Sequence, residues 1–222
     1  MTRVSDKNNF IYLTVSLVIL LLVAALVDQF TIPLGQHLVQ ALTVLTLASG
    51  VVGLRDSRLH FRTKLGLIAG VAVIVLLGAI LDASGLHYAH LLILISFYTW
   101  ATWLAARQVL FSGSIDWNKI VGAICIYLLM GLIWALCYLL IAQATPGAFN
   151  GLEQLPWYEN FADVSYYSYV TLTTLGYGDI SPVAPVARFL VYMEAIVGVF
   201  YMAILVASLI GIRASEIQAK DD

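Results

Sequence analysis

Six stretches of apolar residues dominate this sequence, and each is long enough to cross a lipid bilayer as a helix. They cover residues 10–27, 34–53, 65–82, 88–110, 119–142 and 186–211. A spanning segment must satisfy its backbone polar groups internally, because the hydrocarbon core of the bilayer holds no water. Hydrophobic residues make up 61% of the chain and charged residues 11%, whereas about a quarter of an ordinary soluble domain is charged. We therefore expect an all-α integral membrane protein with six transmembrane helices, the first of them retained and not cleaved as a signal peptide.

The basic residues fall in segments that six helices place on one side of the membrane. They are Arg3, Lys7, Arg55, Arg58, Arg62, Lys64, Arg107, Lys119, Arg213 and Lys220, and Arg188 is the exception. Because basic residues favour the cytoplasmic side, both termini are expected in the cytoplasm, with the protein in the cell membrane. The acidic residues on the other side are Asp28, Asp82, Glu153, Glu159, Asp163 and Asp179. This bias would concentrate cations at the outer face. The alternative is that these are solvated loop residues, an explanation that we favour for Asp28 and Asp82.

The connection between the fifth and sixth apolar stretches is the longest in the chain. Its first part, residues 143–160, is rich in Pro and Gly and is typical of an exposed loop, called the turret below. Asp163 then suits an N-cap, and residues 164–173 are apolar and aromatic but too few to span a bilayer. The sequence therefore predicts a re-entrant helix over 163–173. Irregular backbone after such a helix is tolerated at membrane depth only where protein buries it or it lines water.

After this helix comes the segment Thr173-Thr174-Leu175-Gly176-Tyr177-Gly178-Asp179. Gly176 and Gly178 lack a Cβ and can adopt backbone conformations that turn successive carbonyls toward a common axis. A row of such carbonyls can replace the hydration shell of a potassium ion, and Thr174 adds a hydroxyl at the inner end. Leu175 and Tyr177 are then expected to point away from the axis and to pack as a wall behind the carbonyls. A Gly-Tyr-Gly tripeptide alone is equally well explained as a turn, but its threonine-rich and apolar surroundings favour the ion site.

Residues 174–179 resemble the selectivity filter of potassium channels, and residues 119–211 resemble the pore domain of tetrameric potassium channels throughout. The resemblance implies an outer helix 119–142, a pore helix 163–173, a filter 174–179 and an inner helix 186–211. It also implies a homotetramer, because one chain supplies one filter strand. The expected partners are three identical subunits and membrane lipid. The expected ligand is permeant K⁺, held at Thr174, Leu175, Gly176 and Tyr177, with no cofactor apart from bound lipid.

The same resemblance assigns supporting and gating residues. Thr173, Asp179 and the pair Tyr166 and Tyr167 are expected to support the filter, with interfacial aromatic packing as the ordinary alternative for the two tyrosines. Gly198 falls where inner helices of the family often bend, although a glycine in a membrane helix is about as often a close-packing site. Ala207 and Ile210 are expected to line the narrow cytoplasmic part of the pore as a gate.

The first 112 residues are predicted to form a separate four-helix domain, followed by the pore domain over 113–222. The four helices invite comparison with a voltage sensor, which needs several arginines on its fourth helix because each charge is worth about 2.3 kcal/mol per 100 mV. Residues 88–106 contain no Lys or Arg, and Arg107 is better explained as an interfacial anchor. The chain is thus similar to six-helix bacterial channels that are not voltage-gated, with which it shares short sequence motifs such as Glu-Ala-Ile-Val-Gly at 194–198. Because the link 111–118 is short, each four-helix domain is expected to pack beside its own pore domain.

Glu194 is the one acidic residue in the interior of a predicted span, since Asp82 stands at the very end of the third. A charge at the bilayer centre costs about 3 kcal/mol, so we expect this side chain to be paired within the protein. It lies one helical turn before Gly198, which predicts that it faces the pore helix and shares a hydrogen bond with a hydroxyl such as Thr171 or Ser168. In that place it would brace the filter. A neutral acid that merely ties two helices together is an equally good explanation.

Other function classes have less support in the sequence. A net charge of −2 without a basic tract argues against nucleic acid, and Cys125 and Cys137 within one apolar helix are expected to be buried thiols without a disulfide or metal. A membrane enzyme or transporter would need a catalytic cluster or inverted repeats of broken helices, and neither is visible. A weakly selective cation channel is the nearer alternative, but it would be expected to replace Tyr177 or Gly178. Proton sensing by His37, His60, His87 or His90 is less expected than a role as polar helix ends.

Overall fold

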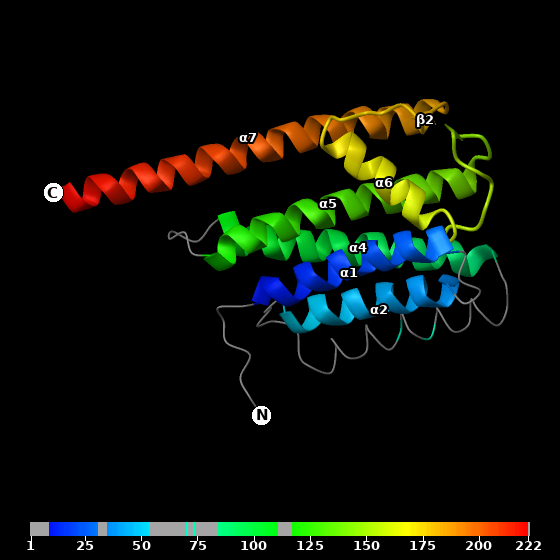
Figure 1. Cartoon of the computed structure of the whole chain (residues 1–222), viewed down its shortest axis with the longest axis horizontal. Helices are drawn as coiled ribbons and strands as arrows, with labels where there is room; N and C mark the ends of the chain where they lie inside the picture. Colours follow the sequence, from blue (N-terminus) through cyan, green and yellow to red (C-terminus); the bar gives the residue numbers. More distant parts are fainter. Residues whose placement is uncertain are drawn as a thin grey trace.

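The computed structural model describes residues 9–30, 35–53, 70, 73, 84–110 and 117–221. These residues form the helices α1 (Asn9–Phe30), α2 (Gly35–Gly53), α4 (Ser84–Leu110), α5 (Trp117–Ala144), α6 (Phe161–Leu172) and α7 (Pro185–Asp221), shown in Figure 1. Two short strands, β1 (Phe149–Asn150) and β2 (Ser181–Pro182), pair antiparallel. The protein is thus all-helical apart from this pair, within the described ranges. The predicted span 65–82 lies outside those ranges except for Gly70 and Val73.

Four of the described helices are long and apolar enough to cross a membrane, which makes this a multi-pass membrane protein. The candidate spans are Phe10–Phe30, His87–Val109, Trp117–Ala144 and Pro185–Leu205. The second predicted span, 34–53, coincides with α2, in which the side chains of the apolar stretch His37–Gly50 are described. The predicted inner helix, 186–211, is longer in the structure, since α7 continues to Asp221. The end of an apolar stretch indicates where the chain leaves the membrane, and residues that favour a helix can extend the helix beyond that point.

The helices pack side by side, and the short helix α6 lies between the two long helices α5 and α7. In Figure 1, α1 lies between α2 and α5, α4 runs along α5, and α6 lies between α5 and α7. The contacts of α1 and α4 with α5 are all made within one chain. The prediction that the four-helix domain packs beside the pore domain of its own subunit agrees with these contacts, and it stays a prediction because the structure holds one chain.

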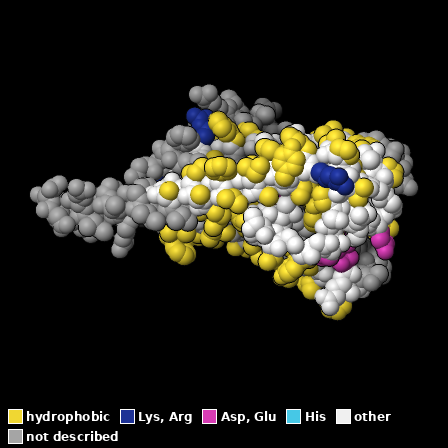
Figure 2. Space-filling view, turned by 90° about the horizontal axis from the view of Figure 1, so that it is seen from above, with side chains coloured by type: hydrophobic (Ala, Val, Ile, Leu, Met, Phe, Trp, Pro, Cys, Tyr) yellow, Lys and Arg dark blue, Asp and Glu magenta, His cyan; other side chains and the backbone are white. Residues whose placement is uncertain are grey.

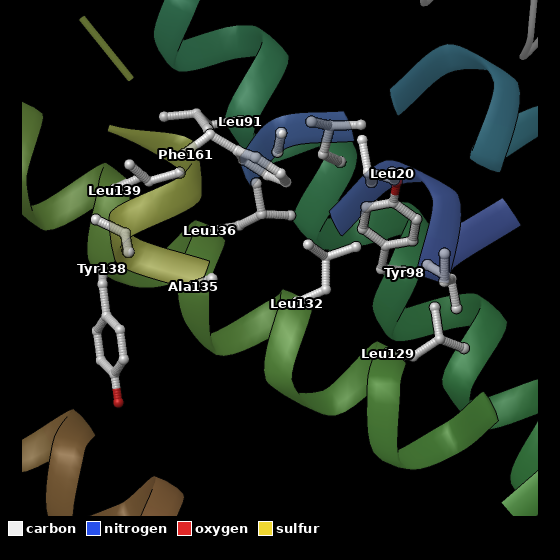
Figure 3. Close-up of a cluster of buried hydrophobic side chains, with 14 of the residues drawn as sticks. Leu20, Leu91, Tyr98, Leu129, Leu132, Ala135, Leu136, Tyr138, Leu139 and Phe161 are labelled. Atoms are coloured by element: carbon white, nitrogen blue, oxygen red, sulfur yellow. The ribbon is translucent and has the colours of Figure 1, made fainter. Parts of the chain in front are cut away.

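A cluster of buried side chains holds α1, α4 and α5 together (Figure 3). Leu129, Leu132, Leu136 and Leu139 recur every three or four residues, so they share one face of α5. They meet Leu20 of α1, Leu91 of α4 and Phe161 at the start of α6. Lipid tails are as apolar as leucine, so close van der Waals packing is what stabilises such a cluster in a membrane. Tyr138 points away from this cluster, toward α7.

The outer face of α7 is apolar and exposed in the single chain. Its exposed side chains include Val186, Phe189, Tyr192, Ile196, Val199 and Phe200. Figure 2 shows hydrophobic side chains over much of the face on which α7 lies, while the acidic side chains visible there gather at the turret end. Such a surface is suited to lipid or to other protein chains and not to water.

Candidate functional site

The re-entrant helix α6 begins two residues earlier than the sequence predicted. The N-cap position is Asn160, and its side chain makes no capping hydrogen bond. Instead the side-chain amide of Asn160 donates from Nδ2 to the backbone carbonyl of Glu153 at 2.8 Å, which ties the start of α6 to the turret. The prediction that Asp163 is the N-cap is wrong, because this tie extends the helix upstream of it. Asp163 lies in the first turn, where a negative charge still interacts favourably with the helix dipole.

The turret is fastened to the loop that follows the Gly-Tyr-Gly segment. Strands β1 and β2 pair Phe149 with Pro182 and Asn150 with Ser181. Gly151 follows with a φ of 77°, and a Cβ there would run into the carbonyl oxygen of Asp179. Glycine is therefore required by both conformation and space. This contact fixes the outer end of the loop after α6.

The backbone after α6 alternates in handedness. Thr174, Gly176 and Gly178 have φ values of 62°, 55° and 84°, and the residues between them have negative φ. A positive φ at a threonine is strained and costs about 1–3 kcal/mol, and strain of this kind is concentrated at functional sites. The amides of Leu175 and Gly176 both donate back to the Val170 carbonyl, at 2.9 and 3.3 Å.

The carbonyls of residues 174–178 have no hydrogen-bond donor within the described part of the chain. A carbonyl without a donor at membrane depth is costly unless it faces water or a cation. The alternation in handedness, together with these unpaired carbonyls, makes the segment suited to bind a cation through backbone oxygens.

Two neighbouring tyrosines on α6 have different partners. The exposed Tyr166 donates from its hydroxyl to Oδ2 of Asp179 at 2.7 Å, and the amide of Ile180 donates to Oδ1 at 3.0 Å. Tyr167 is buried, with its ring centroid 5.5 Å from that of Tyr138 and 5.9 Å from that of Phe149. Tyr166 thus connects α6 to the outer end of the loop, while Tyr167 packs α6 against α5 and the turret.

The hydrogen bond between Tyr166 and Asp179 shifts both ionisations. It favours the carboxylate, and so holds the pKa of Asp179 below its usual value. The phenol donates in the same bond and would lose it on ionising, which raises the pKa of Tyr166 to about 12.

We therefore expect the outer end of the loop to keep its structure across the neutral pH range. The pKa of Asp179 is lower in the folded state, so its stabilising effect is complete above the unfolded value and disappears only as the pH falls through the lowered value. The pKa of Tyr166 is raised, so its effect disappears only as the pH rises through about 12. Carbon-13 NMR titration of Asp179 should show its midpoint move upward in Tyr166→Phe. An unchanged midpoint would contradict the assigned hydrogen bond.

Leu175 and Tyr177 do not form the expected wall within a single chain. Their side chains are 56% and 67% exposed. A cavity of about 360 Å³ lies between the loop, α6 and α7, lined in part by Thr171, Tyr177 and Val191. The side of the loop that should be packed is therefore open in one chain.

Glu194 is fully buried where α5, α6 and α7 meet. The hydroxyls of Ser168 and Tyr138 each lie 2.5 Å from one of its two carboxyl oxygens. The predicted hydrogen bond with Ser168 is confirmed, whereas Thr171 is not a partner. Sequence reasoning missed Tyr138, although a tyrosine hydroxyl in an apolar helix needs a polar partner and so pointed to one.

Gly198 lies against the end of α6. A Cβ on Gly198 would meet the Leu172 carbonyl oxygen, and the Tyr127 hydroxyl donates to the same oxygen at 3.2 Å. The close-packing explanation of Gly198 is therefore confirmed, and its role as a hinge stays a prediction. Helix α7 continues through Ala207, which is exposed, and Ile210, whose side chain lies outside the described set.

The remaining predicted residues and several unpredicted ones serve the same junction. The Thr173 hydroxyl donates to the Tyr169 carbonyl at 2.7 Å. The Tyr169 hydroxyl donates to the Leu128 carbonyl at 2.7 Å, and a Cβ on Gly131 would collide with the Tyr169 ring. Cys125 and Cys137 are free thiols, and no cluster of metal-binding residues is found in the described ranges.

Comparison with known proteins finds similarity for this part of the chain. Residues 122–212, which include α6 and the loop, match the family model described as "Ion channel". This region is similar to an ion-channel pore domain, and that family is one of channels and not of enzymes. Over 92 residues the chain is 35% identical to the inward rectifier potassium channel Kirbac3.1 of Paramagnetospirillum magnetotacticum. That alignment covers 40% of this chain and 27% of the relative, so the chain matches only a minor part of that protein's length. No solved structure matches the chain.

Proposed function

We propose that the protein is a potassium-selective channel that conducts K⁺ passively through a filter formed by Thr174, Leu175, Gly176, Tyr177 and Gly178. The observation that carries the proposal is the row of unpaired carbonyls after α6, on backbone of alternating handedness. Backbone carbonyls replace water around a dehydrated K⁺. The name of the aligned relative, an inward rectifier potassium channel, adds support.

The surroundings of the loop favour a cation there. The C-terminal end of α6 carries the partial negative charge of the helix dipole and immediately precedes Thr174. Asp179 lies at the other end of the loop and is kept ionised by Tyr166. With both termini in the cytoplasm, as we propose, the acidic turret end faces outward and attracts cations to the entrance.

The proposed channel is a homotetramer, because one loop offers carbonyls on one side of an ion only. Three further chains complete the ring around the ion. The exposed Leu175 and Tyr177 and the open cavity behind them then become buried against neighbouring subunits. Part of the apolar face of α7 serves the same contact, and lipid covers the rest.

Ion flux from proteoliposomes tests the proposal. Vesicles that contain the purified protein and an outward K⁺ gradient should accumulate a rubidium tracer, and barium, similar in size to K⁺ but doubly charged, should block the uptake. Vesicles with an equivalent Na⁺ gradient should not accumulate it. Equal uptake under the two gradients would refute the proposed selectivity.

We assign residues 1–112 to a static scaffold and not to a voltage sensor. The hydroxyls of Thr46 and Tyr98 lie 2.5 Å apart and join α2 to α4, and those of Ser16 and Ser49 lie 2.7 Å apart and join α1 to α2. Neutral hydroxyls experience no net force from the membrane potential. In α4, the one basic residue of the last turn is Arg107, which is exposed.

We therefore expect open probability to vary little over about ±100 mV, a range in which each gating charge contributes about 2.3 kcal/mol per 100 mV. Arg107→Gln should leave any residual voltage dependence unchanged. Single-channel recording in planar bilayers measures both. A steep conductance–voltage curve that flattens in Arg107→Gln would show that α4 does sense voltage.

A further inference from the structure

One serine hydroxyl at the centre of the pore domain lies between two oxygens that normally only accept hydrogen bonds. Oγ of Ser168, on α6, lies 2.7 Å from the carbonyl oxygen of Gly131 on α5 and 2.5 Å from Oε1 of Glu194 on α7. Ser168 is fully buried, and so is Glu194. Both separations are those of hydrogen bonds between oxygens.

A serine hydroxyl has a single hydrogen, so Ser168 can donate to only one of these two neighbours. A carbonyl oxygen carries no hydrogen, and neither does an ionised carboxylate. If Glu194 were ionised, one of the two close contacts would be between oxygens with no hydrogen between them. Both contacts become hydrogen bonds only if Glu194 is the donor in one of them.

The other carboxyl oxygen of Glu194, Oε2, already accepts a hydrogen bond. The Tyr138 hydroxyl lies 2.5 Å from Oε2 and donates to it. A hydrogen placed on Oε2 would compete with that donation and would leave the contacts of Ser168 unresolved. The acidic hydrogen therefore belongs on Oε1.

The electrostatic surroundings agree with this count of hydrogens. The titratable groups that interact with Glu194 are Tyr127, Cys137 and Tyr138 on α5 and Tyr167 and Tyr169 on α6. None of them is a cation, and no salt bridge to Glu194 is present among the residues described. An ionised carboxylate that is buried without a cation is strongly disfavoured.

The geometry points to Glu194 as a neutral carboxylic acid that donates from Oε1 to Ser168, while Ser168 donates to the Gly131 carbonyl and Tyr138 donates to Oε2. This directed series of three hydrogen bonds joins the three helices of the pore domain. Its polarity requires the acid form, and an ionised Glu194 would reverse the Ser168 hydroxyl and release the Gly131 carbonyl.

Glu194 is thereby a positioning residue for the loop after α6. Ser168 lies one turn before Leu172, and the carbonyl of Val170 between them accepts the amides of Leu175 and Gly176. Fixing Ser168 fixes the point from which the loop departs. This positioning role rests on the proposed channel function, whereas the protonation state does not.

Infrared spectroscopy of the full-length protein in lipid vesicles at neutral pH tests the protonation state directly. The spectrum of the wild type should contain a carbonyl band of a protonated carboxylic acid that Glu194→Gln removes and deuterium oxide shifts. Ser168→Ala deletes the acceptor of the acidic hydrogen and should move the same band to higher frequency. Absence of a band that depends on Glu194 would overturn the inference.

Ion flux tests the positioning role separately. A glutamine can donate to Ser168 and accept from Tyr138, so Glu194→Gln should conduct and select like the wild type. Glu194→Ala removes both partners and should lower flux by about tenfold or more, since two buried hydroxyls lose a hydrogen bond. A large loss in Glu194→Gln would overturn the inference. Protonated Glu194 in a protein without potassium selectivity would refute the proposed function and leave the protonation intact.

Discussion

Gly178→Asp is expected to abolish the discrimination between potassium and sodium. Gly178 has a φ of 84°, a conformation that side chains with a Cβ resist, and it lies at the end of the carbonyl row. Aspartate adds both a Cβ and a charge where the backbone must approach the ion. Reversal potentials under a potassium/sodium gradient should shift toward zero in this variant.

The control for Gly178 is another glycine with positive φ. Gly147 has a φ of 74°, and a Cβ at either position meets nothing within 4 Å. Alanine therefore causes a similar conformational strain of about 1–2 kcal/mol at both sites. Gly178→Ala should weaken selectivity, whereas Gly147→Ala, in the turret, should leave it intact. Equal effects of the two alanines would mean that strain alone, and not the approach to an ion, explains the result.

Gly198→Ala is expected to cause the second large effect, a loss of conduction accompanied by reduced stability. The added Cβ would meet the carbonyl oxygen of Leu172, with the Leu172 carbonyl carbon at 3.2 Å and its Cδ1 at 3.0 Å. Overpacking of this kind costs about 1–3 kcal/mol. It should displace α7 from the end of α6, where the proposed filter begins. Thermal unfolding of the purified protein and single-channel current measure the two effects.

Two further variants show whether the backbone of Leu172 is the obstacle. Leu172→Ala removes the Cδ1 contact but not the carbonyl, so it should not rescue Gly198→Ala. Gly70 is exposed, and a Cβ there meets nothing within 4 Å, so Gly70→Ala should leave conduction unchanged. Normal conduction by Gly198→Ala would disprove the close contact between α7 and α6.

The sequence predicted the helices more reliably than the residues that join them. Spans follow from the length of an apolar stretch, which a bilayer dictates regardless of tertiary structure. The pore helix was predicted over 163–173 and lies at Phe161–Leu172, because Asn160 is tied to the turret by a hydrogen bond that no local pattern reveals. The contact of Glu194 with Ser168 was predictable, since a buried acid near a hydroxyl has few alternatives.

Other features that depend on distant segments were not predictable from the sequence. Nothing in the spacing of Tyr138 indicated that it shares Glu194 with Ser168, because the two helices meet only in the folded chain. The positive φ of Thr174 was also missed, since the conformation is unusual for a residue with a branched Cβ. The wall of Leu175 and Tyr177 was predicted for carbonyls that face a common axis, and a single chain leaves both side chains exposed.

The reversal potential of single channels under bi-ionic conditions tests the central claim most directly. The purified protein is placed in a planar bilayer with potassium on one side and sodium at the same concentration on the other. A filter of backbone carbonyls predicts a current that reverses far from zero, on the side set by potassium, and that barium blocks. A reversal potential near zero, with sodium carrying as much current as potassium, would contradict the account.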